Sequence, residues 1–229
     1  MHRRVLENHS TQQPRVVSDM SEVRKITAIG SRKRDHILRA AEQEFERYGF
    51  SGARMQRIAD LAEVPKANVH YYFKNKAALY NAVLANVIAL WDEALAPINT
   101  EDDPKEILTQ YVQKKVEFTR LYPAATRIFA LELLQGAHHM SKHLDKQTRR
   151  WTRDRASEIN SWVENKKILP VDPYHLIFLI WATTQHYAQA EVQVKSIYKK
   201  KNLTEEDFSN LSESLIDMVL RICGLEESS

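Results

Sequence analysis

The stretch VPKANVHYYFKNKAAL, Val64 to Leu79, decides the fold predicted for this chain. A histidine and three aromatic residues stand side by side in it, and lysines follow directly. A helix buried in a core does not carry four neighbouring ring residues, because they cannot all point inward. The stretch therefore predicts a short helix whose outer face presents rings and positive charge to a partner.

Two further helices are predicted in front of this stretch. An amphipathic helix over 32–48 ends at a glycine cap, Gly49, and a short helix over 55–63 follows it. A tight turn, "EVP", joins that helix to the one over 66–73, which is typical of a helix-turn-helix unit. The apolar residues with helical spacing in the first helix are Ile37, Ala41, Phe45 and Tyr48.

The second helix of such a pair enters the major groove of DNA. Asn68 and His70 can offer hydrogen bonds, Tyr71 can contact a phosphate and a thymine methyl, and lysines supply charge. Tyr72 could equally pack in the core or contact DNA. For the three predicted helices as a whole, the alternative is an ordinary helix bundle that does not bind DNA. The inner face of the pair is expected to contain Val69 and Phe73 opposite Ile58, Ala59 and Ala62.

Composition predicts a folded protein of the cytoplasm. Of its 229 residues, 43% are hydrophobic and 28% are charged. Cys223 is the single cysteine, so no disulfide can form within the chain and a reducing compartment is expected. It stands in an apolar helical pattern and is interpreted as a small core residue. The polar N-terminus and the short apolar run over 176–182 predict neither a secretory signal nor a membrane partner.

Charge is unevenly distributed along the chain. Residues 31–79 carry ten Lys or Arg against six Asp or Glu, whereas residues 80–229 carry 18 against 21. A basic N-terminal third on a mildly acidic body favours a polyanionic partner for that third alone. Residues 1–30 show no periodicity and are expected to form a flexible basic arm.

Helical spacing continues through the rest of the chain without strand-like alternation, so the predicted fold class is all-α. Residues 31–78 are expected to form the DNA-binding domain, and residues 79–229 a larger helical domain for ligand binding and dimerisation. Proline and glycine separate the further helices, which are predicted over 75–94, 104–121, 124–135, 138–166, 173–199 and 204–223.

The segment ILRAAEQEFERYGFSGARMQRIADLAEVPKANVHYYFKNKAALYNAVL, residues 37–84, resembles the N-terminal domain of TetR-type transcriptional regulators. It shares with them an aromatic-Gly-aromatic helix end, an Ile-Ala pair, a valine-led turn, the Tyr-Tyr-Phe run and a following lysine. It departs from the family at Ala53, where a capping Thr is common, and at His70, where Tyr is common. The resemblance and the groove argument together assign seven residues to DNA binding: Gln56, Lys66, Ala67, Asn68, His70, Tyr71 and Lys76. The resemblance implies that Lys76 contacts a phosphate.

Two later segments, LYPAATRIFALELLQGA and WVENKKILPVDPYHLIFLIWATTQHYA, resemble the RutR subgroup, the uracil- and thymine-responsive repressors of pyrimidine utilisation. That resemblance implies a drug-sized pocket in the C-terminal domain. Trp181 and Gln185 share a helix face there. Ordinary core packing is the alternative for the tryptophans. The candidate ligand-binding residues are Trp91, Phe129, Glu132, Trp181 and Gln185.

The last predicted helix carries an apolar seam with spacings of three and four, which is typical of helix pairing between subunits. Packing within its own subunit is the alternative. The seam residues predicted to form a homodimer interface are Phe208, Leu211, Leu215, Met218 and Ile222.

No catalytic constellation, phosphate loop or cofactor motif is found, so an enzyme is not expected. His139 and His143 lie one turn apart and could hold a metal, or could belong to a solvated helix start. Two functions stay open. One is a dimeric repressor controlled by a small molecule, with uracil or thymine indicated and a different effector as the alternative, and the other is a constitutive DNA-binding dimer without ligand.

Overall fold

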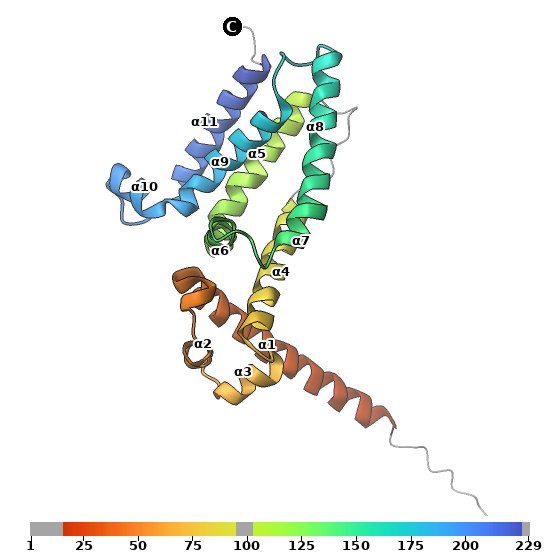
Figure 1. Ribbon diagram of the computed structural model, residues 1–229, viewed down its shortest axis with the longest axis vertical. Helices are drawn as coiled ribbons and strands as arrows, with labels where there is room; N and C mark the ends of the chain where they lie inside the picture. Colours follow the sequence, from red (N-terminus) through yellow and green to blue (C-terminus); the bar gives the residue numbers. More distant parts are fainter. Residues whose placement is uncertain (1–15, 95–102, 226–229) are drawn as a thin grey trace, which may run out of the picture.

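The structure consists of two helical parts that α4 connects (Figure 1). The computed structural model describes the backbone of residues 16–94 and 103–225, and the side chains of residues 32–90 and 103–225. These residues form helices and no strand, which confirms the all-α prediction. The elements are α1 (Val16–Gly52), α2 (Met55–Leu61), α3 (Lys66–Tyr72), α4 (Lys76–Ala94), α5 (Pro104–Leu121), α6 (Pro123–Leu134), α7 (Ser141–His143), η1 (Leu144–Thr148), α8 (Arg149–Glu164), α9 (Pro173–Gln189), α10 (Glu191–Tyr198) and α11 (Glu205–Cys223).

The first helix begins at Val16, earlier than the sequence predicted. Residues 16–30 are helical, and residues 1–15 lie outside the described residues. That residues 1–30 form a flexible arm stays a prediction. Residues 16–30 contain no proline, and a helix that has formed extends at little cost for each further residue. Val17, Met20, Val23, Ile26 and Ile29 recur at intervals of three, a helical spacing that the prediction overlooked.

The core of the N-terminal part lies between α1, α2, α3 and α4. Ile58, Ala59, Ala62, Val69 and Phe73 are all buried in it, which confirms the predicted inner face of the helix pair. The same cluster contains residues of α6 and of the loop after α6, so the N-terminal part shares its core with the C-terminal domain. The two parts are therefore packed together by apolar contacts as well as linked by the chain.

Gly49 interrupts α1 where the sequence predicted a cap. Its φ of 63° lies in a region that residues with a side chain rarely adopt. The chain changes direction there and presents Phe50 to Tyr80, with ring centroids 5.1 Å apart. The turn thereby packs the end of α1 against α4.

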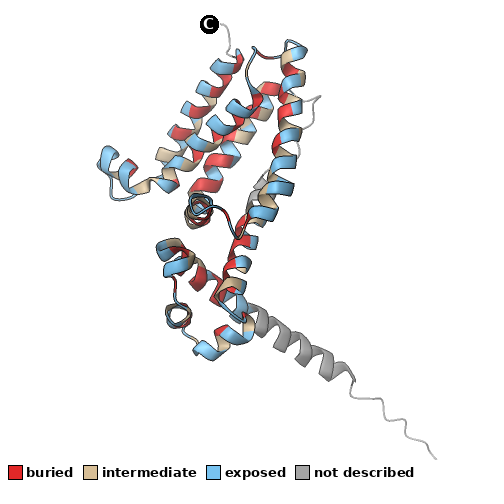
Figure 2. Ribbon diagram, viewed as in Figure 1, coloured by how far each residue is buried: buried red, intermediate tan, exposed pale blue. Residues whose placement is uncertain are grey.

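The second core lies in the C-terminal domain, where α5, α9 and α11 run beside one another and α8 covers one flank (Figure 1). Buried faces turn toward the centre of this group, and exposed faces turn outward (Figure 2). Cys223 is fully buried, and burial raises the pKa of its thiol to about 11, which confirms it as a core residue.

Local capping residues fix the starts of the long C-terminal helices. Asp103 and Asp172 each accept a hydrogen bond from a backbone N–H of the first turn, with a proline next in sequence. Thr204 and Asp207 form a reciprocal capping box at α11. Gly224 ends α11 with φ 69°, and an added Cβ would lie 2.5 Å from Leu169.

Two predicted helices are divided in the structure. The helix expected over 138–166 becomes α7, the π-helical segment η1 and α8. The helix expected over 173–199 breaks at Ala190, and α10 continues in a new direction. Arg127 of α6 donates a hydrogen bond to the carbonyl oxygen of Ala188 at this break. A contact from a residue so distant in sequence leaves no local signal.

Candidate functional site

The outer face of α3 presents most of the residues assigned to DNA. Lys66, Ala67, His70 and Tyr71 are exposed, and Asn68 is partly buried. The Tyr71 side chain is 82% exposed and meets Tyr72 edge-on, with ring centroids 5.2 Å apart. An exposed aromatic side chain between cations suits a nucleic acid, which offers phosphates and base edges.

Gln56 lies on the exposed face of α2 and donates a hydrogen bond to Asp60, 2.9 Å away. Its amide is therefore in reach of solvent but held along its own helix. A DNA contact from Gln56 requires it to exchange Asp60 for a base or a phosphate, so the assignment stays a prediction.

Lys76 begins α4 and already has partners within the chain. Its ammonium group donates to the carbonyl oxygens of Ser51 and Ala53, at 3.2 and 3.1 Å, and lies 4.8 Å from the centre of the Phe50 ring. These contacts tie the turn after α1 to the start of α4. A phosphate contact of Lys76 stays a prediction. Lys66, at the start of α3, is exposed and is the more accessible of these two lysines.

Glu44 was missed by the sequence analysis. Its carboxylate is buried, accepts from the backbone N–H of Arg54 at 2.9 Å, and pairs with Arg57 at 2.7 Å. Arg54 gives α2 no cap from its own side chain. A carboxylate of α1 therefore holds the start of α2, at the place where Ala53 departs from the family.

Glu132 lies at the junction of the two parts and not beside Trp181. Its side chain is 2% exposed, and both oxygens are bonded: Tyr80 donates from its hydroxyl at 2.9 Å and His139 from its backbone at 2.7 Å. Burial raises the pKa of Tyr80, and this hydrogen bond adds to the rise. Phe129, one turn earlier, packs against the N-terminal core.

The predicted ligand residues are thus divided between two places. Trp181 belongs to the C-terminal core and donates from its indole to the hydroxyl of Tyr111 at 2.6 Å. Gln185 is half-buried, and its carbonyl oxygen accepts from Gln189 at 3.1 Å. The side chain of Trp91 lies outside the described residues.

Polar residues on one stripe of α5 were also missed. Tyr111, Lys115 and Thr119 follow one another at intervals of four, and all three face the interior. Burial holds the pKa of the Lys115 ammonium well below its usual range, and Thr119 Oγ1 has no hydrogen-bond partner among the described residues. Buried polar side chains of this kind are unusual in a plain hydrophobic core. Their spacing of four is the one sequence signal that could have predicted this stripe.

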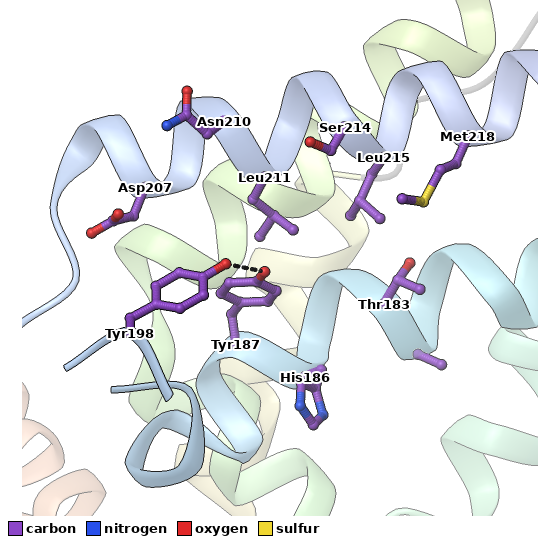
Figure 3. Close-up of a pocket in the computed structure, with 11 residues that line it drawn as sticks. Thr183, His186, Tyr187, Tyr198, Asp207, Asn210, Leu211, Ser214, Leu215 and Met218 are labelled. Carbon is purple, nitrogen blue, oxygen red and sulfur yellow. Dashed lines mark hydrogen bonds between the residues drawn. The ribbon is translucent and has the colours of Figure 1, made fainter. Parts of the chain in front are cut away.

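The predicted dimer seam is divided between two faces of α11. Leu211 and Leu215 are buried in their own subunit, and Phe208 is partly buried there. Met218 and Ile222 are 56% and 42% exposed. A groove of about 760 Å³ runs between α9, α10 and α11, with Met218 at one end and Tyr187 hydrogen-bonded to Tyr198 at the other (Figure 3).

Within the described part of the chain, no helix is long and apolar enough to cross a membrane. The same residues hold no cluster of three or more potential metal ligands. Nδ1 of His139 lies 3.1 Å from Oδ1 of Asn81, and the imidazole packs against the rings of Phe50 and Tyr80. His139 is therefore part of the junction between the two helical parts.

The short helix pair α2–α3, with a buried inner face and an exposed basic and aromatic outer face, defines a helix-turn-helix regulator. The chain belongs to the TetR family of bacterial regulatory proteins: residues 37–83 match that family's N-terminal domain, and residues 84–226 match the C-terminal region of YcdC-like proteins. Regulators of this family bind DNA and small-molecule effectors and act as dimers.

Similarity extends to particular relatives. The chain is 39% identical over 180 residues to the transcriptional regulator RutR of Escherichia coli K12, covering 79% of this chain and 84% of RutR, which supports the RutR subgroup. It is 34% identical over 109 residues to the repressor NicS of Pseudomonas putida, covering 47% of this chain and 51% of NicS. These relatives are transcriptional regulators.

Solved structures support the fold. The fatty acid degradation regulator FadR of Bacillus halodurans matches with a TM-score of 0.60 at 19% identity, over 82% of this chain and 94% of FadR. AibR in complex with isovaleryl coenzyme A and operator DNA matches with a TM-score of 0.57 at 18% identity, over 81% of this chain and 97% of AibR.

Proposed function

We propose that the chain is a repressor that binds a palindromic DNA operator as a dimer, and that uracil or thymine is the effector through which it controls pyrimidine metabolism. The observation that carries the DNA part is the outer face of α3, where the highly exposed Tyr71 stands with Lys66 and His70. The identity to RutR, together with the resemblance to the uracil- and thymine-responsive subgroup, supports the effector part.

A second copy of the chain would cover the exposed apolar side chains of α9 and α11. Phe178 and Leu179 are exposed on α9, and Met218 and Ile222 on α11. Two helices from each copy would then form a four-helix interface. Leu211 and Leu215 are not part of this proposed interface, because each already packs within its own subunit.

The proposed effector site lies around Trp181, Gln185 and the polar stripe of α5. A pyrimidinedione is a flat ring whose edge alternates acceptor, donor and acceptor. Indole and phenol rings can stack on such a ring, and the amide of Gln185 can pair with one N–H and one carbonyl together. Lys115 and Thr119 add polar groups to an interior that would otherwise be apolar.

Glu132 is proposed to act at the junction and no longer as an effector contact, because the hydroxyl of Tyr80 and the backbone of His139 occupy both of its oxygens. A second connection lies nearby. Arg127 of α6 pairs with Glu46 of α1 and, at 3.0 Å, with Glu191 of α10. A movement of α6 or α9 on effector binding would thus change the contacts of α1 and α4, the helices that pack against the pair α2–α3.

Isothermal titration of the full-length chain with uracil, thymine and cytosine tests the effector assignment. Uracil and thymine are expected to bind, and cytosine to be rejected, because its amine reverses the hydrogen-bond pattern of the edge. Gln185→Leu should weaken uracil binding by about 1–3 kcal/mol, whereas Gln193→Leu, at an exposed position of α10, should leave it unchanged. Equal binding of cytosine, or no heat with uracil at millimolar concentration, would remove the pyrimidine assignment.

A further inference from the structure

A row of exposed cations runs from α7 through η1 into α8, on one flank of the C-terminal domain (Figure 1). This row, which we call the α8 basic face, consists of Lys142, Lys146, Arg149, Arg150 and Arg153. Steps of three or four residues join its members, so their side chains share one side of the helix. Both lysines are exposed, and the three arginine side chains are between 69% and 79% exposed.

The α8 basic face carries more positive charge than its neighbours balance. Residues 142–154 contain five Lys or Arg against two Asp, whereas residues 80–229 as a whole contain 18 against 21. The two aspartates lie 3.3 to 3.7 Å from the arginines. Ion pairs between such exposed side chains contribute little stability, so the arginines can exchange them for another anion. A concentrated positive charge on an otherwise acidic domain indicates an anionic partner.

The α8 basic face stays open in the proposed dimer. The dimer forms through α9 and α11, and α8 and α11 lie on opposite flanks of the C-terminal domain (Figure 1). The other side of α8 packs into the core through Thr152, Ala156, Ile159 and Trp162, which are all buried. Neither the core nor the second copy therefore covers the cations, and the dimer presents one such face on each outer flank.

The side chains of the face favour a nucleic acid over a protein as the anionic partner. The centre of a protein–protein interface is poor in charge and rich in aromatic side chains, whereas protein–DNA interfaces are polar and strongly positive. None of residues 141–154 is an exposed large hydrophobic residue, and both Leu144 and Trp151 are partly buried. Three of the five cations are arginines, whose planar guanidinium groups bind two phosphate oxygens at once.

We propose that the α8 basic face is a second DNA-binding surface, which holds the phosphate backbone of a duplex segment other than the operator. Because α8 extends away from α3 (Figure 1), a straight duplex seated on α3 does not run along it. Binding at this face is independent of base sequence, since phosphates are the same at every position. A dimer on its operator thus holds a further stretch of DNA by either flank.

Anisotropy of a labelled duplex of scrambled sequence tests the proposal. The full-length chain is first saturated with unlabelled operator duplex, selected from random sequences, at about 50 mM salt. We expect the scrambled duplex to bind this complex, with log K falling against log salt at a slope of about −3, as for three neutralised phosphates. No binding of the scrambled duplex overturns the proposal. Tighter binding of labelled polyglutamate also overturns it, and assigns the face to an acidic segment of a protein.

Two double variants with the same loss of charge place the surface. Lys146→Gln with Arg153→Gln should weaken binding of the scrambled duplex about tenfold or more and reduce the salt slope by about two. Lys199→Gln with Lys201→Gln, in the exposed loop after α10, should change neither quantity. Both variants should bind the operator duplex like the parent chain, so a failure of the proposed function is seen separately. Equal weakening by the two variants would mean that net charge alone attracts the duplex, and would refute the proposal.

Discussion

Glu44 shows how one residue replaces a missing local signal. The sequence places Ala53 where a capping Thr is common, which leaves the start of α2 without a cap of its own. In the structure a carboxylate from α1 accepts from Arg54 and pairs with Arg57. Because the partners are ten and more positions away, periodicity and capping rules cannot find this contact in the sequence.

Replacing Glu44 with Ala should lower the free energy of unfolding by about 1–3 kcal/mol, because a buried N–H and a guanidinium lose their acceptor. Urea unfolding followed by circular dichroism measures the change. Gln43→Ala, at the exposed neighbouring position, serves as the control and should stay within about 0.5 kcal/mol of the parent chain. Equal stability of both variants would show that the cap is not formed.

Lys115 gives the second prediction at this scale. Burial lowers its pKa below the usual 10.5, so the folded state loses the proton at lower pH than the unfolded state. Below the folded pKa both states carry the proton and the cost of burying the charge is complete. Between the folded pKa and 10.5 the unfolded chain binds more protons, so stability rises with pH.

Lys115→Met should therefore stabilise the chain most at the acidic end of this range, with a gain that shrinks as the pH rises toward 10.5. Thermal unfolding at a series of pH values up to about 10 compares the variant with the parent chain. A difference that does not change with pH would contradict a depressed pKa. Lys114→Met, at the exposed neighbouring position, is the control.

At the scale of elements, the sequence predicted the helix pair closely. The structure begins α3 at Lys66, as predicted, and ends it at Tyr72, one residue before the prediction. The inner face could be predicted because Val69 and Phe73 carry the helical spacing of a local pattern. Both residues are buried in the N-terminal core.

Distant contacts explain what the sequence did not predict. The break before α10 coincides with a hydrogen bond from Arg127, and the two oxygens of Glu132 are taken by α4 and by the loop after α6. The spacing of Phe208, Leu211, Leu215, Met218 and Ile222 is regular, yet α11 has two apolar faces that periodicity alone does not separate. The π-helical segment η1 has no pattern that distinguishes it from an α-helix.

Substitutions on α3 should separate base recognition from charge. Tyr71→Ala should reduce discrimination between a selected duplex and a scrambled one by about 1–3 kcal/mol if a base contact is lost. Lys66→Ala should weaken binding to both duplexes alike and reduce the slope of log K against log salt by about one. Fluorescence anisotropy over a salt series measures both quantities. Identical behaviour of the two variants would show that α3 does not read the bases as proposed.

At the scale of the whole molecule, dimerisation should depend on the outward face of α11. Met218→Asp together with Ile222→Asp places charge on the proposed interface, at a cost of several kcal/mol. Light scattering should show half the parent mass, and operator binding should fall with it. Leu134→Asp, at an exposed position of α6, should leave the mass unchanged. A double variant that keeps the dimer mass would place the interface on another surface.

The junction between the two parts makes control by a ligand possible. The N-terminal core includes residues of α6, and hydrogen bonds and ion pairs of Glu132 and Arg127 cross the same boundary. A change in the packing of the C-terminal domain therefore alters contacts of α1 and α4. In a dimer, the separation of the two α2–α3 pairs must match the spacing of the operator half-sites. Small rotations of these pairs are therefore enough to weaken operator binding.

Anisotropy of a labelled operator duplex, selected from random sequences by the full-length chain, tests this account most directly. The account predicts that uracil or thymine added to the preformed complex weakens binding by about 1–3 kcal/mol, the usual size of such coupling, while cytosine leaves it unchanged. Gln185→Leu should bind the duplex as well as the parent chain but lose the response to uracil. A complex that uracil and thymine leave intact at millimolar concentration, with the duplex still bound as a dimer, would contradict the account and leave a DNA-binding dimer that pyrimidines do not control.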